Sequence, residues 1–226
     1  MKLVIVSGPP SSGKTSVILK TIKQLQTKGI KVGVVKFDCL QTDDDKIYAK
    51  ENILVKKGLS ASVCPDHYFA SNIMEVTKWG LENKLDYLIS ESAGLCNRCS
   101  PYLKDIKSIC VIDNLSGINT PQKIGTMLKL ADIVLITKGD IVSQAEREVF
   151  ATKVYQVNPK ATIMHINGLT GQGTNELCML IEDSLDIITL EGCELRFSLP
   201  SAVCSYCLGE TKIGEAYQIG NVRKIN

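Results

Sequence analysis

Short runs of Val, Ile and Leu alternate along the chain with longer stretches in which apolar residues recur every three or four positions. The short runs are almost continuously apolar, which is typical of strands buried on both faces of a sheet. Six of them are predicted as strands, at residues 2–7, 31–37, 87–91, 108–113, 133–137 and 162–166.

The longer stretches have the spacing of amphipathic helices. They are predicted as helices at residues 14–28, 44–57, 67–83, 121–130, 143–157 and 174–185. Strands that alternate with helices form right-handed crossovers and parallel pairs. The pattern therefore predicts an α/β fold, a three-layer doubly wound and mostly parallel sheet.

The pattern changes near residue 190, where helical spacing gives way to short strand-like pieces separated by turns. A chain of 226 residues is long enough for one large domain. We expect one domain over residues 1–189 and a short C-terminal appendage over 190–226 that contains two of the cysteines.

Composition narrows the class of protein without naming it. The chain is 44% hydrophobic and 22% charged with a formal net charge of +2, so it offers no broad attraction for nucleic acid or an anionic membrane. No apolar run approaches the ~20 residues needed to span a bilayer, and no signal peptide precedes the first strand. We expect a soluble, cytoplasmic protein that binds neither nucleic acid nor membrane.

The clearest chemical signal follows the first predicted strand. Residues 8–15 read Gly-Pro-Pro-Ser-Ser-Gly-Lys-Thr and open a helix, which matches the phosphate-binding P-loop in sequence and in context. Such a loop directs backbone N–H groups at phosphates, while its Lys neutralises their charge and its Thr hydroxyl ligates Mg²⁺. The predicted nucleotide-binding residues here are Gly8, Ser11, Ser12, Gly13, Lys14, Thr15 and Ser16.

A second signal concerns the base of the nucleotide. Thr137-Lys138-Gly139-Asp140 follows a predicted strand, and a carboxylate there accepts both N1–H and N2–H of guanine, which adenine does not offer. The stem of Lys138 packs along the base plane. Asp140 therefore favours GTP over ATP, although an exposed turn is the structural alternative. The Gly-rich segment 167–173 is a weaker candidate for closing over the base.

Carboxylates at the ends of two strands predict the magnesium site, because ligands bind at the carboxyl edge of such sheets. Asp38 and Glu91 are predicted to hold Mg²⁺ with Thr15, and Lys14, Asp38 and Glu91 are the predicted catalytic groups. Gly94 follows Glu91 closely and offers its N–H to the γ-phosphate. Residues 43–45 are three aspartates that either join this site or stabilise a helix N-terminus.

Nine cysteines in a chain expected to be cytoplasmic point to metal binding rather than disulfides. Two C-x-x-C pairs, Cys96/Cys99 and Cys204/Cys207, suit Zn²⁺, Ni²⁺ or an Fe–S cluster, within one chain or across a dimer. Cys64 and His67 form a further candidate pair. Single cysteines such as Cys110 and Cys178 are expected in the core.

Over residues 1–188 the chain resembles the SIMIBI-class P-loop GTPases of the HypB, UreG and CobW-like metalloenzyme-maturation group. The residues that carry the resemblance are 8–16, 35–38, 42–44, 86–94 and 137–140. The resemblance implies GTP hydrolysis with Mg²⁺, slow intrinsic turnover, a homodimer, and delivery of a metal or metallocofactor into a client enzyme. Residues 64–67 read Cys-Pro-Asp-His, which departs from the urease-type Cys-Pro-His by one inserted residue.

Three functions remain open on the sequence alone. The first is a GTP-driven metallochaperone or maturation factor. The second is a small-molecule kinase using the same P-loop, which would need an acceptor pocket and usually an arginine-rich lid that the sequence does not contain. The third is a nucleotide-binding metal or Fe–S sensor with little catalysis.

Overall fold

The computed structural model describes residues 1–63, 65–95, 99–197, 211–217 and 223–225. Seven strands form one sheet in the order β3-β2-β4-β1-β5-β6-β7, and every pair is parallel. The strands are β1 (Lys2–Ser7), β2 (Val32–Asp38), β3 (Leu54–Leu59), β4 (Tyr87–Ser92), β5 (Lys107–Asp113), β6 (Ile133–Thr137) and β7 (Thr162–His165). The predicted doubly wound α/β fold is confirmed, and the sheet is wholly parallel.

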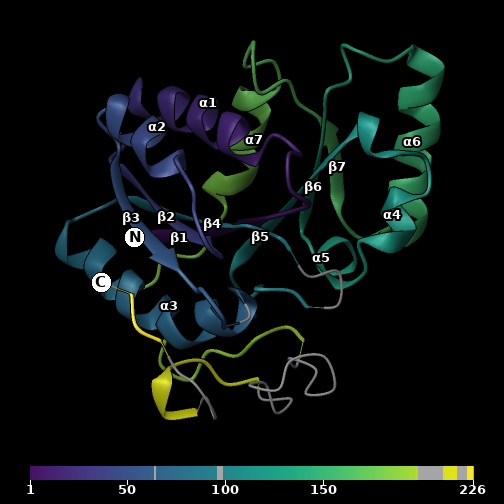
Figure 1. The fold of residues 1–226 in the computed structure, drawn as a ribbon. Helices are drawn as coiled ribbons and strands as arrows, with labels where there is room; N and C mark the ends of the chain where they lie inside the picture. The colour runs from purple at the N-terminus through teal and green to yellow at the C-terminus, as the bar shows by residue number, and fades with distance from the viewer. Residues whose placement is uncertain (64, 96–98, 198–210, 218–222, 226) are drawn as a thin grey trace.

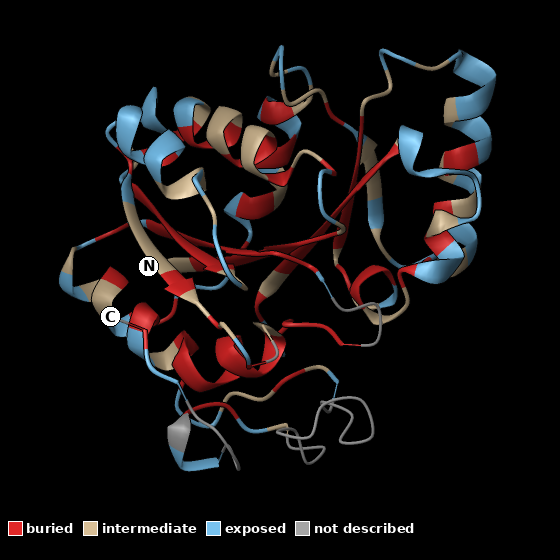
Figure 2. Cartoon of the chain, in the orientation of Figure 1, coloured by how far each residue is buried: buried red, intermediate tan, exposed pale blue. Residues whose placement is uncertain are grey.

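Helices cover both faces of this sheet (Figure 1). One face carries α1 (Lys14–Gln26), α2 (Asp44–Lys50) and α7 (Thr174–Glu182), and the other carries α3 (Pro65–Glu82), α4 (Thr120–Lys123), α5 (Thr126–Lys129) and α6 (Gln144–Val157). Two hydrophobic clusters, one on each side, bury the central strands almost completely (Figure 2). This burial explains why the strands read as continuous apolar runs.

The prediction of a single helix over residues 44–57 is wrong. The helix α2 ends at Lys50, and Asn52 adopts a left-handed φ of 56° before β3 begins at Leu54. β3 is an edge strand, so its lysines stay partly exposed and its pattern lacks the continuous apolar character of the central strands. That half-polar composition hides the strand from a search for apolar runs.

The predicted helix over residues 121–130 is two short helices, α4 and α5. Gly125 interrupts it with φ 66° and ψ −128°, a conformation that a helix does not contain. Both pieces still bury apolar side chains, with Met127 and Leu128 in the core. The helical spacing therefore predicts helical structure here, but Gly125 divides it into two helices.

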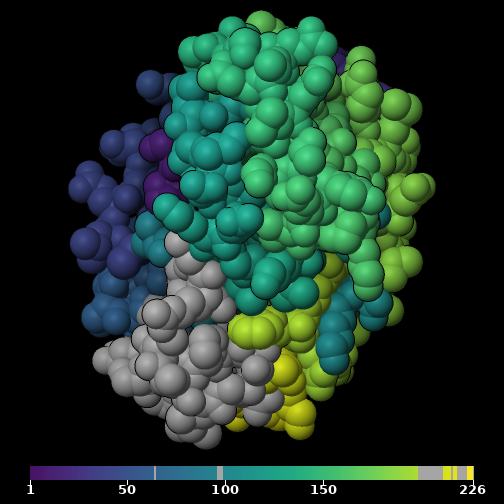
Figure 3. Space-filling view, turned by 90° about the vertical axis from the view of Figure 1, so that its right-hand side faces the viewer, coloured from purple at the N-terminus to yellow at the C-terminus, as the bar shows by residue number. Residues whose placement is uncertain are grey.

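The described part of the C-terminal segment packs outside α3 (Figures 1 and 3). Gly214 N–H donates to the Ala70 carbonyl at 2.9 Å, and the Asn72 side chain accepts from Ile225 N–H at 2.8 Å. Residues 66–73 of α3 are consequently buried all round, between the sheet and this segment. The described residues of this segment make two isolated bridges, Leu195 with Leu103 of the body and Glu194 with Lys212 within the segment.

Among the described residues, no helix is long and apolar enough to cross a membrane.

Candidate nucleotide-binding site

The P-loop connects β1 to α1 at the carboxyl edge of the sheet. Its backbone requires glycine at both ends: a Cβ on Gly8 would lie 2.0 Å from the Val111 carbonyl oxygen, and Gly13 has φ 90° as the residue preceding α1. No side chain caps α1, so its first N–H groups face the loop. This is the local geometry that the sequence motif predicts for a phosphate site.

Lys14 lies at the start of α1 and folds back over the loop. Its Nζ donates to the carbonyl oxygens of Gly8 at 3.0 Å and Pro9 at 2.7 Å. Burial lowers the pKa of Lys14 to about 8, partly offset by the charge of Glu91. The ammonium group therefore lies in the pocket at the loop, ready to exchange two carbonyl contacts for phosphate oxygens.

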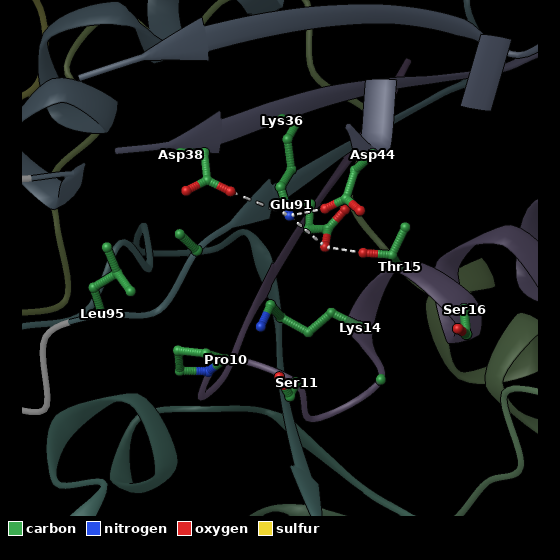
Figure 4. A pocket seen from close by; sticks show the side chains of 12 residues that line it. Pro10, Ser11, Lys14, Thr15, Ser16, Lys36, Asp38, Asp44, Glu91 and Leu95 are labelled. Carbon is green, nitrogen blue, oxygen red and sulfur yellow. Dashed lines mark hydrogen bonds and ion pairs between the residues drawn. The ribbon is translucent and has the colours of Figure 1, made fainter. Parts of the chain in front are cut away.

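Glu91 is the centre of a buried polar network beside the loop (Figure 4). Its side chain is fully buried; Oε1 accepts from Thr15 Oγ1 and from Lys36 Nζ, both at 2.8 Å, and Oε2 accepts from the Tyr48 hydroxyl at 2.7 Å. Burial and the adjacent Glu91 carboxylate raise the pKa of Tyr48 well above its usual range. The structure thus brings Thr15 and Glu91 together, as the sequence indicates.

Lys36 was missed by sequence reasoning. The β2–β4 register places it directly opposite Glu91, and its ammonium also pairs with Asp44 at 2.6 Å and with Asp38 at 3.9 Å. Burial opposes its charge, but Glu91 and Asp44 outweigh burial and raise the pKa of Lys36. The signal available in the sequence was a lysine inside the otherwise apolar strand Val32–Asp38.

The three aspartates at 43–45 have separate roles. Asp44 lines the pocket with Lys14, Thr15 and Asp38, and its pKa is lowered because hydrogen bonding from Lys36 and the ammonium charge outweigh burial. Asp43 pairs with Lys46 at 2.6 Å and Asp45 with Lys57 at 2.7 Å, both away from the pocket. Asp43 gives α2 no side-chain cap.

Gly94 connects the segment after β4 to the P-loop. It has φ +63°, and a Cβ at this position would lie 1.8 Å from the Gly8 carbonyl oxygen. Only a residue without a side chain allows this approach of the two backbones. Of the predicted nucleotide-binding residues around this loop, Ser11, Gly13, Lys14, Thr15 and Ser16 line the pocket, whereas Gly8, Ser12 and Gly94 do not.

The predicted base-recognition segment contacts the other side of the P-loop. Thr137 Oγ1 donates to the Ser12 carbonyl at 2.6 Å, and Lys138 Nζ donates to the Ser11 carbonyl at 2.8 Å. Asp140 is exposed and lines a second pocket with Arg147, His165, Asn167 and Gln172. The segment 137–140 and the segment 167–173 therefore line one pocket, and the segment 137–140 contacts the P-loop.

Four of the six candidate soft-metal ligands lie outside the residues that the structure describes. Cys64, Cys96, Cys204 and Cys207 lie outside the described residues, Cys99 is buried in the hydrophobic core, and His67 is buried within α3. Within the described ranges no three His, Cys, Asp or Glu side chains are arranged so that they alone could hold a metal ion, and this includes the carboxylates of the P-loop pocket. Cys110 and Cys178 are buried, as expected of core cysteines.

Comparison with known proteins agrees with this architecture. Residues 2–165 match the family described as CobW/HypB/UreG, nucleotide-binding domain. A match over that much of the chain defines the class, so the protein belongs to the CobW/HypB/UreG family of P-loop NTPases, whose members typically hydrolyse GTP. The resemblance seen in the sequence is confirmed.

Two individual relatives are similar to this chain over most of its length. The chain is 51% identical over 226 residues to an uncharacterized protein of Methanocaldococcus jannaschii, covering 100% of this chain and 97% of the relative. It is 31% identical to the urease accessory protein UreG 2 of Methylorubrum extorquens, over 79% of this chain and 89% of the relative.

Solved structures share the fold. The hydrogenase maturation factor HypB from Archaeoglobus fulgidus aligns with a TM-score of 0.64 at 19% identity, over 80% of this chain and 89% of that one. HypB from Helicobacter pylori, solved in complex with nickel, aligns with a TM-score of 0.63 at 19% identity, over 81% and 87%.

Proposed function

We propose that the protein is a Mg²⁺-dependent GTPase whose nucleotide state controls delivery of a metal or metallocofactor into a client enzyme. One observation carries the proposal: Lys14 and Thr15 of the P-loop share a pocket with the carboxylates of Glu91, Asp44 and Asp38. Membership of the CobW/HypB/UreG family supports the same conclusion.

The donor set of this pocket fits Mg²⁺. The Thr15 hydroxyl and the Glu91 carboxylate approach to 2.8 Å, and Asp38 and Asp44 add hard oxygen atoms at the same pocket. Thr15, Asp38 and Glu91 are the residues proposed to hold the ion or its waters. When bound, Mg²⁺ would neutralise charge on the β- and γ-phosphate oxygens.

The protein residues act mainly by positioning and by electrostatics, which dominate phosphoryl transfer. Lys14 leaves the carbonyl groups of the loop and binds the β- and γ-phosphates. Glu91 holds the Thr15 hydroxyl in place from a fully buried position. The N–H of Gly94 is proposed to donate to the γ-phosphate. The close approach of the Gly94 and Gly8 backbones would couple the segment after β4 to the nucleotide.

Asp140 is proposed to read guanine, with Lys138 packed along the base. Support comes from the hydrogen bonds of Thr137 and Lys138 to P-loop carbonyls, which hold the segment 137–140 beside the phosphate site. The exposed Asp140 lines the same pocket as Asn167. Two acceptor contacts to N1–H and N2–H would exclude adenine.

A nucleotide-dependent homodimer is part of the proposal. Apolar side chains are exposed in the loops that follow the strands at the nucleotide edge, among them Leu40 after β2 and Leu95 after β4. Exposed apolar groups around a binding site are typical of interaction surfaces. Sedimentation velocity with GDP and with a non-hydrolysable GTP analogue tests this, and a monomer in both states contradicts it.

The cargo metal or cluster is assigned to Cys96, Cys99, Cys204 and Cys207, with Cys64 and His67 as a further pair. The proposal draws on the thiolate chemistry of C-x-x-C pairs and on the family, including a HypB solved with nickel. Anaerobic purification with elemental analysis measures the stoichiometry. The four Cys→Ser variants should lower it, whereas the core variant Cys178→Ser should leave it unchanged.

The hydrolysis proposal has a direct test with a matched pair of threonines. Thr15→Ala should weaken Mg²⁺-dependent GTP binding and remove turnover, because Thr15 lies beside Glu91 in the pocket. Thr27→Ala removes an exposed hydroxyl contact at the end of α1 and should change neither. Equal binding of ATP and GTP by the unaltered protein would instead favour the small-molecule kinase.

A further inference from the structure

A lysine occupies the position where the proposed function requires a divalent cation. Lys36 Nζ lies 2.8 Å from Glu91 Oε1, the same oxygen that accepts the Thr15 hydroxyl, and 2.6 Å from Asp44 Oδ2. Figure 4 shows the ammonium pointing into the space between these carboxylates. Lys36 is 3% exposed, so its charge depends on these partners.

The charges around Lys36 do not balance. Three carboxylates, those of Asp38, Asp44 and Glu91, face the Lys36 ammonium within 4 Å. The Lys14 ammonium lines the same pocket and interacts electrostatically with Glu91, but its hydrogen bonds go to the carbonyls of Gly8 and Pro9. Three carboxylates and two ammonium groups leave the pocket with a net negative charge. Uncompensated carboxylates beside a threonine hydroxyl favour a dication over a monocation.

We propose that Lys36 is a built-in counter-ion that holds the magnesium ligands together in the nucleotide-free protein and is displaced from Glu91 and Asp44 when Mg²⁺ enters with GTP. This inference rests on the proposed magnesium site at Thr15 and Glu91. An ion bound by the Thr15 hydroxyl would lie within a few ångströms of the Lys36 ammonium, and like charges at that distance repel strongly. The two cations therefore exclude each other from the shared oxygens.

The displacement has a structural consequence for α2. Asp44 lies at the first position of α2 and Tyr48 one turn later, and Lys36 and Glu91 hold these two side chains. The loop of residues 39–43 joins β2 to α2, and the Lys36–Asp44 ion pair fixes the position of its end. Release of Lys36 would free Asp44 to follow the metal, so nucleotide entry would reposition the start of α2.

The first experiment measures binding of Mn²⁺ alone, without nucleotide, by electron paramagnetic resonance. We expect the unaltered protein to bind weakly, and Lys36→Met and Lys36→Gln to bind at least tenfold more tightly. Lys36→Arg keeps the positive charge and should bind as weakly as the unaltered protein. Lys57→Met is the matched control, because Lys57 belongs to the neighbouring strand and pairs with Asp45 outside the pocket.

Tenfold tighter Mn²⁺ binding confined to the two neutral variants supports the counter-ion. Equal affinity in folded Lys36→Met, Lys36→Gln and unaltered protein overturns it. If the neutral variants do not fold in metal-free buffer, recovery of their near-ultraviolet circular dichroism on addition of Mg²⁺ supports the inference, and failure to recover counts against it. If the unaltered protein does not bind GTP in a Mg²⁺-dependent manner, that result refutes the proposed function itself, separately from the counter-ion role of Lys36.

Discussion

Two ion clusters, one near the carboxyl ends of β2 and β4 and one at the start of β5 and β6, differ in how completely their charges and hydrogen-bonding groups are paired. Arg196, in the C-terminal segment, donates five hydrogen bonds: two to the Asp132 carboxylate and one each to the carbonyls of Leu103, Ile106 and Leu130. Every donor of the guanidinium is used and the charges match. Both clusters line a pocket, but Lys36 faces three carboxylates instead of one.

The difference separates a structural cluster from a functional one. A balanced and fully hydrogen-bonded cluster has nothing further to bind, and the Arg196 cluster joins the C-terminal segment to β5 and β6. A cluster with excess carboxylates attracts a further cation, because buried carboxylates without a positively charged partner are unfavourable. Two of the following variants change the nucleotide site and should affect nucleotide binding, and two change the attachment of the C-terminal segment and should affect stability.

The largest effect is expected from Gly94→Ala. A Cβ would lie 1.8 Å from the Gly8 carbonyl oxygen, so the segment after β4 or the P-loop must move. We expect GTP affinity, measured by isothermal titration calorimetry, to fall by more than about 100-fold, which is ~3 kcal/mol. Gly29→Ala is the control: it has a similar φ of +76° and open space around it. A similar loss in both would show that backbone strain, not the contact, is responsible.

Asp140→Asn should change specificity next most strongly. The amide accepts fewer hydrogen bonds from guanine than the carboxylate does, and two charge-assisted bonds at about 1.5 kcal/mol each correspond to a loss on the order of 100-fold. Competition between GTP and ATP analogues measures this. The exposed Asp183→Asn is the control. Unchanged preference for GTP would remove Asp140 from the base site.

Arg196→Met should lower stability and leave nucleotide binding unchanged. It removes the partner of Asp132 and of three backbone carbonyls, and because the pair is partly exposed we expect a loss of about 2 kcal/mol in the free energy of unfolding. Urea denaturation measures it, and calorimetry with GTP checks the site. Weaker GTP binding in this variant would show that the two clusters are coupled.

Lys104→Met should have the smallest effect. Lys104 pairs with Glu194 at 2.6 Å on the same side of the molecule as Arg196, but the lysine side chain is largely exposed. Exposed pairs contribute about 0.2–1 kcal/mol, so urea denaturation should show a loss below ~1 kcal/mol. A loss as large as that of Arg196→Met would mean that attachment of the C-terminal segment, not satisfaction of the buried donors, sets its stability.

The sequence predicted the central part of the fold because local pattern and final burial agree there. The strands β1, β4, β5 and β6 are buried along almost their whole length and are mainly apolar, and the P-loop motif sets the turn from β1 to α1. The edge strand β3 was missed because two adjacent lysines and a glycine interrupt its apolar run, and the α4–α5 break depended on the φ of Gly125.

By itself the sequence determined the class of fold, the P-loop, and the two strand-end carboxylates, since each depends on residues close together in the chain. Only the tertiary structure decided that Lys36 lies opposite Glu91, that Asp44 alone of three aspartates reaches the pocket, and that Gly94 contacts Gly8. The first and the last of these relations join residues 55 and about 86 positions apart. Strand register and backbone approach create these two, and neither is encoded in a local pattern.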